Sequence, residues 1–138
     1  MARTLCAYLT PERLPDHDTL QAALTRLGYR FKLDGRFDAA TAQAYLPCTL
    51  EGEDAGLYLQ FEALARVPEP AAAGLADPQR ALLRLRWGGD AREHLSACLV
   101  AVALARDFGA LLVDPDSGTV QADDALLKQA KRLHQENF

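Results

Sequence analysis

The sequence predicts an α+β fold in which helices pack on one face of a mostly antiparallel sheet. Short segments alternate apolar and polar residues, as in the run from Leu83 to Trp87, and helical patterns lie between them. The order is strand, helix, strands, helix, strand, helix. A ferredoxin-like β-α-β-β-α-β core with an extra C-terminal helix is recovered if residues 29–55 are an insertion.

Length and charge narrow the class of protein. The chain has 138 residues, of which 49% are hydrophobic and 25% charged, and its formal net charge is −4. We expect a single domain over residues 1–138, large enough to bury a core without metals or disulfides. A mildly acidic chain is a poor candidate for nucleic-acid binding, which needs clustered Lys and Arg.

The first third of the chain predicts a strand, a helix and a strand. Residues 3–10 are mostly apolar without a helical stripe, and Pro11 follows them. Pro15–Asp18 is typical of a helix entry, because either Asp can cap free backbone N–H groups. The helical spacing of leucines then stops at Gly28. Residues 29–33 alternate, which favours a short strand.

The middle of the chain is less regular. Residues 36–46 are ambiguous and could form a short helix that breaks before Pro47. A hairpin is expected next, with arms at 48–50 and 57–65 joined by a turn over 51–56. Residues 67–78 hold three prolines and a run of alanines, so we expect a surface loop there.

The last third predicts two helices. Asp90 and Glu93 have the spacing of a capping box, with Asp as the cap of a helix over 91–107. The remaining elements are expected in this order: a strand over 80–88 before that helix, a strand over 110–113 after it, a turn at 114–118, a hairpin arm at 119–121, and a helix from about Asp123.

The 91–107 helix is apolar around its whole circumference between Ala97 and Ala105. A helix of this kind is buried on more than one side. The sheet and the C-terminal helix can provide that cover, or the helix can form the interface of a homodimer. The nine-residue run is about half of what a membrane span needs.

Two features are candidates for binding a protein partner. One is an acidic turn, and the other is the polar face of the strands at 57–65 and 80–88, which we expect to be exposed. Tyr and Arg are frequent anchors in protein interfaces. The candidate partner-binding residues are Glu51, Glu53, Asp54, Tyr58, Glu62, Arg84 and Arg86.

Few residues of the sequence are candidates for a catalytic role. His94 lies near the start of the 91–107 helix, beside Glu93 and near Asp90, so it could act as the base of a small hydrolase or transferase. No nucleophile, metal-binding set or phosphate loop accompanies it. We therefore predict no catalytic residues, metal or cofactor.

Several segments together resemble a family. They are Pro47 to Leu59, Arg86-Trp87-Gly-Gly-Asp90, the alanine-rich helix and Ala110-Leu-Leu-Val-Asp114. This set is similar to small bacterial α+β proteins, some of which resemble immunity partners of interbacterial toxins. The resemblance implies a cytoplasmic protein that binds and neutralises a cognate toxin. It does not assign a function to any particular residue of this chain.

The leading hypothesis is a non-enzymatic, cytoplasmic protein-binding domain that acts as an immunity protein or inhibitor. It expects a protein partner, which could be a secreted toxin, and neither a nucleic acid nor a membrane. The alternatives are an enzyme that uses His94 and an oligomeric scaffold built through the 91–107 helix. No secretory signal opens the chain, and Cys6, Cys48 and Cys98 are widely spaced, which favours a reducing compartment.

Overall fold

The computed structural model describes residues 3–38, 43–65 and 80–138. Within these residues the strands form one antiparallel seven-stranded sheet in the order β2-β3-β4-β5-β1-β6-β7. The strands are β1 (Arg3–Leu9), β2 (Phe31–Leu33), β3 (Gln43–Leu50), β4 (Glu53–Ala63), β5 (Ala81–Trp87), β6 (Leu111–Val113) and β7 (Val120–Gln121).

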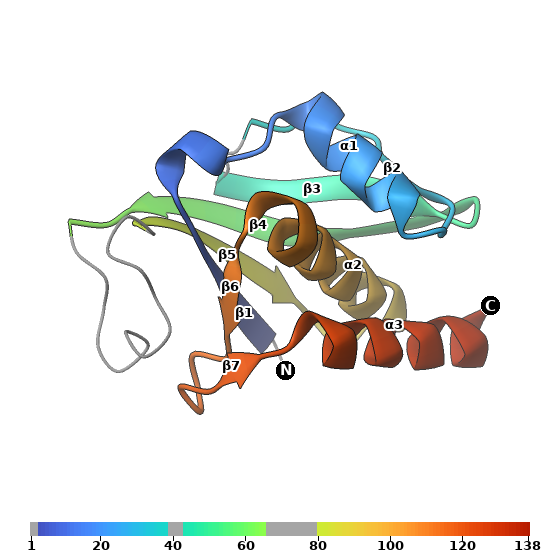
Figure 1. Cartoon of the computed structure of the whole chain (residues 1–138). Helices are drawn as coiled ribbons and strands as arrows, with labels where there is room; N and C mark the ends of the chain where they lie inside the picture. Colours follow the sequence, from blue (N-terminus) through green and yellow to red (C-terminus); the bar gives the residue numbers. More distant parts are fainter. Residues whose placement is uncertain (1–2, 39–42, 66–79) are drawn as a thin grey trace.

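The helices lie together on one side of this sheet (Figure 1). They are α1 (His17–Arg26), α2 (Ala91–Phe108) and α3 (Asp123–Asn137), and a short 3-10 turn, η1 (Pro11–Arg13), precedes α1. Helix α2 packs against β4 and β5, with α1 and α3 as its neighbours. The α+β class predicted from the sequence is confirmed.

Four adjacent strands account for the ferredoxin-like pattern. Their order across the sheet is β4-β5-β1-β6, and every neighbouring pair is antiparallel. Along the chain they follow the order strand, helix, strand, strand, helix, strand. Strands β2 and β3 extend the sheet beyond β4, in the segment that the sequence suggested as an insertion.

Helix α2 is the centre of the core. Every residue from Leu95 to Leu104 is buried within the single chain. The sheet lies on one side, and α3 and α1 lie alongside. The cover expected from the sheet and the C-terminal helix is therefore present. A second copy would have to displace a helix to reach these side chains, and homodimerisation through α2 stays a prediction.

The hairpin differs from the prediction in both of its arms. Strand β3 begins at Gln43, so residues 43–46 are extended, and the helical interpretation of them was wrong. The turn is only Glu51-Gly52, both with positive φ (52° and 80°), which is the pattern of a tight two-residue hairpin turn. Strand β4 therefore starts at Glu53, four residues earlier than predicted.

Two predicted features fall wholly or partly outside the described residues. They are the loop at 67–78 and residues 39–42 of the ambiguous segment. Among the described helices, none combines the length and the apolar character needed to cross a membrane.

Candidate functional site on the outer face of the sheet

The face of the sheet away from the helices carries a row of aromatic and basic side chains. The strand register places Tyr45 of β3 opposite Tyr58 of β4, and Tyr58 opposite Arg86 of β5. Tyr45 is 39% exposed and Tyr58 is 52% exposed. Their rings meet edge to face with centroids 5.0 Å apart. We call Tyr45, Tyr58 and Arg86 the outer row.

Tyr45 is held in place by the backbone beneath it. Its hydroxyl donates to the carbonyl of Ala55 at 3.1 Å. Gly56 makes this possible, since a Cβ there would lie 2.6 Å from the phenol oxygen and 2.5 Å from the carbonyl oxygen of Leu46. The φ of Gly56 is 143°, which L side chains rarely adopt. Its N–H donates to the buried hydroxyl of Ser96 in α2.

The two arginines of this face differ in their partners. Arg84 makes an ion pair with Glu62 at 2.6 Å, and both side chains are partly exposed. Pairs of opposite charge on neighbouring strands are common on the exposed face of an antiparallel sheet. Arg86 is exposed and makes no hydrogen bond or ion pair with any residue that the structure describes. Its exposed guanidinium therefore has no partner within the described part of the chain, and Arg86 stands opposite Tyr58 in the strand register.

The outer face is not polar throughout. Cys6, Tyr8, Leu82 and Val113 form a small buried apolar cluster on the same side, around the middle of β1. Burial raises the pKa of the Cys6 thiol and the Tyr8 phenol. The exposed aromatic and basic side chains are therefore concentrated over β3, β4 and β5.

The acidic turn is divided between the two faces. Glu51 accepts from the backbone N–H of Arg30 at 3.4 Å and lies 3.3 Å from the His134 ring nitrogen in α3. Glu53 pairs with Arg92 of α2 at 3.2 Å. Both carboxylates thus attach the hairpin to the helices. Asp54 is exposed, and the alternation of β4 places it on the same face as Tyr58.

Within the residues that the structure describes, His94 does not pair with a carboxylate, as a catalytic base commonly does. Its ring stacks on Trp87, with centroids 5.1 Å apart and planes 10° from parallel. Burial, and then the positive charge of Arg3, lowers its pKa, so the ring is neutral at pH 7. Asp90 caps the N–H of Arg92, and Glu93 accepts from the N–H of Gly88 at 3.0 Å. The cap at Asp90 is confirmed, but the reciprocal bond of the predicted capping box is not formed.

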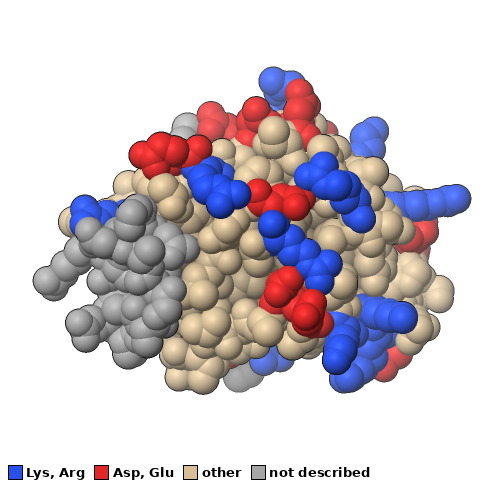
Figure 2. All heavy atoms as spheres, in the orientation of Figure 1, with Lys and Arg blue, Asp and Glu red and all other residues tan. Residues whose placement is uncertain are grey.

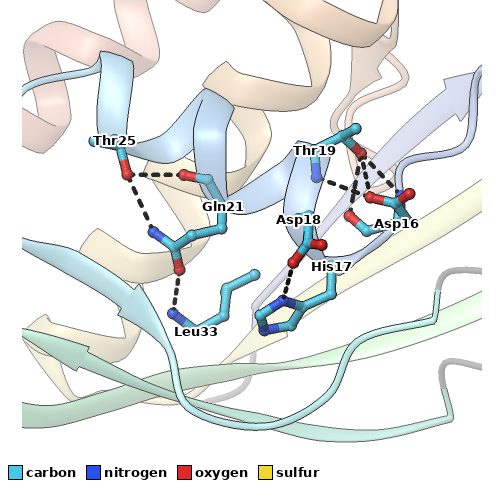
Figure 3. Close-up of polar contacts among 7 residues, drawn as sticks. All are labelled: Asp16, His17, Asp18, Thr19, Gln21, Thr25 and Leu33. Carbon is cyan, nitrogen blue, oxygen red and sulfur yellow. Dashed lines mark hydrogen bonds and ion pairs between the residues drawn. The ribbon is translucent and has the colours of Figure 1, made fainter.

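Sequence reasoning missed two features of the surface. Tyr45 was overlooked because residues 36–46 had no clear period. His17 was missed as well, because its surroundings are set by the fold: its Nδ1 lies 3.3 Å from an Asp18 oxygen at the N-terminus of α1 (Figure 3). His17 lines a large cleft beneath this helix end.

Comparison with models of protein families, with curated proteins and with solved structures finds no match to this chain. The resemblance to immunity proteins stays a prediction.

Proposed function

We propose that the protein is a non-enzymatic binding domain that recognises another protein through the outer row, and that it acts as an immunity protein against a cognate bacterial toxin. The observation that carries the proposal is the outer row itself. Two tyrosines and an arginine that has no partner among the described residues lie on neighbouring positions across three strands, exposed to solvent. These are the residue types that dominate binding energy in protein interfaces.

The rigidity of the row supports a role in recognition. Tyr45 is fixed by its bond to Ala55, and its ring supports that of Tyr58. A side chain that is already ordered loses little conformational entropy when a partner binds. Arg86 then needs a carboxylate from the partner, because its guanidinium would otherwise be desolvated without a counter-charge.

Asp54 and Glu62 add charge at the margin of the row. Rim charges mainly change the rate of association and its dependence on salt. We therefore assign the steering role to Asp54, while Glu51 and Glu53 serve the contacts with α3 and α2. On the opposite side of the molecule, where the helices lie, acidic and basic side chains are intermixed (Figure 2).

Affinity capture from the native host tests the proposal. The baits are the wild-type protein, Arg86→Glu in the outer row, and Arg132→Glu on the exposed side of α3, which changes the net charge equally. We expect the wild type and Arg132→Glu to capture one protein that Arg86→Glu does not capture. That protein should arrest growth when expressed alone, and co-expression of the wild-type chain should restore growth. Equal capture by the two variants, or no protection, would contradict the proposal.

A further inference from the structure

A cleft of about 1210 Å³ opens beside the start of α1, and Tyr45 of the outer row is among its lining residues. One wall is the segment Pro11–Thr19, which contains η1 and the start of α1, and the other is residues 36–38. The apolar surface of the lining comes mainly from Leu14, Tyr45 and Phe108, whereas Leu46 and Leu59 are almost fully buried. This lining comes from five parts of the chain, which explains why no local sequence pattern revealed it.

The two walls are tied together at the helix entry. Asp16 and Asp38 form an isolated antiparallel bridge, so their backbones lie side by side. Asp16 also caps α1 by accepting from the N–H and the hydroxyl of Thr19 at 2.8 and 2.9 Å. These bonds lower the pKa of the Asp16 carboxyl, which is therefore ionised at neutral pH. Figure 3 shows the cap and the neighbouring His17–Asp18 contact.

The charges that line the cleft are unequal. Its acidic residues are Glu12, Asp16, Asp18 and Asp38, and its basic residues are Arg13 and Arg36. The guanidinium of Arg13 donates to the backbone carbonyl of Asp107 at the end of α2, which turns it toward that helix. Four carboxylates therefore line the cleft together with two guanidinium groups and the His17 ring.

The volume of the cleft and the residues that line it together indicate a class of ligand. Sites for small molecules usually enclose about 300–1,000 Å³, so this cleft is large enough for a chain segment. Its acidic rim favours a cation, and its apolar floor favours aliphatic side chains between the charges. We propose that this cleft binds a basic, amphipathic peptide segment that alternates lysine or arginine with aliphatic residues. The proposal does not depend on the function proposed above, although Tyr45 belongs both to the outer row and to the lining of the cleft.

Fluorescence anisotropy with a defined probe tests the assignment. The probe is a fluorescein-labelled seven-residue peptide that alternates lysine with leucine, and its twin carries glutamate in place of lysine. The cleft variant is Glu12→Lys with Asp18→Lys. The matched control is Asp116→Lys with Glu136→Lys, which replaces two exposed acids outside this cleft and changes the net charge by the same amount.

We expect saturable binding of the lysine peptide and none of the glutamate peptide. The cleft variant should weaken binding about tenfold or more, because two attractions become two repulsions, and the control should change it less than about threefold. If the cleft variant unfolds, Glu12→Gln with Asp18→Asn takes its place, with about fivefold weakening expected.

The position of the bound peptide supplies an independent readout. A version of the lysine peptide that carries benzophenone should crosslink to residues 11–19 or 36–38 of the wild-type protein. Three results would overturn the proposal: no saturable binding at millimolar peptide, equal weakening by the cleft variant and the control, or crosslinks confined to other segments.

Discussion

The geometry at Gly56 makes a direct prediction about the support of the outer row. In Gly56→Ala, the new Cβ would lie 2.5 Å from the Leu46 carbonyl oxygen and 2.6 Å from the Tyr45 hydroxyl. Two costs add up. A residue other than glycine at a φ of 143° costs about 1–3 kcal/mol, and overpacking costs about 1–3 kcal/mol more. We expect the free energy of unfolding to fall by about 4 kcal/mol.

Gly52→Ala is the matched control. Gly52 also has a positive φ, of 80°, but a Cβ there would meet no atom within 4 Å. Only the backbone cost remains, so a loss of about 1 kcal/mol is expected. Urea unfolding followed by circular dichroism measures both variants. Equal losses would show that the close contacts around Gly56 are absent.

A double-mutant cycle isolates the share that belongs to Tyr45. Tyr45→Ala removes the phenol that a Cβ at position 56 would strike, but leaves the Leu46 carbonyl in place. The double variant should therefore be more stable than the sum of the single effects predicts, by about 1–2 kcal/mol. Strict additivity would refute the placement of the Tyr45 ring over Gly56, and with it the rigid outer row.

Two further predictions concern the sheet edge and the core thiols. The Gln21 amide donates to the Phe31 carbonyl at 2.9 Å and accepts from the Leu33 N–H at 2.7 Å, so it covers the edge of β2. Gln21→Ala should lower stability by about 1–2 kcal/mol and cause concentration-dependent association through the open edge, which light scattering would detect; a fully stable monomer would contradict this role. Burial raises the pKa of the Cys48 and Cys98 thiols from 9.0 to about 12. The unfolded chain therefore loses these protons first, and the free energy of unfolding should fall above pH 9 by about 1.4 kcal/mol per pH unit for each thiol; Cys98→Ala should flatten the profile, and an unchanged slope would contradict the assignment.

Local patterns explain which elements were predictable. Strand β5 could be predicted because Leu83, Leu85 and Trp87 alternate strictly with arginines. The apolar residues occupy the buried face of the strand, and the arginines occupy the face toward solvent. Helix α1 follows from the Asp16 cap and the leucine spacing, and α2 follows from Asp90 and its apolar circumference. In each case the residues that predict the element lie within the element itself or directly before it.

The parts that were missed depend on distant contacts. The start of β3 has no alternating pattern and contains Pro47, so only its pairing with β4 shows that it is a strand. The sequence could not show that Glu51 and Glu53 turn toward the helices, because their partners, His134 and Arg92, are distant along the chain. The cleft depends on the bridge between Asp16 and Asp38, two residues that no periodicity connects.

The most direct test of the central claim is the dissociation constant of the captured partner for Tyr58→Ala beside Phe138→Ala. Both variants remove an exposed aromatic ring, one from the outer row and one from the C-terminus. If the outer row is the anchor, Tyr58→Ala weakens binding about thirtyfold and Phe138→Ala leaves it unchanged. Equal dissociation constants for Tyr58→Ala and the wild-type protein would contradict the account.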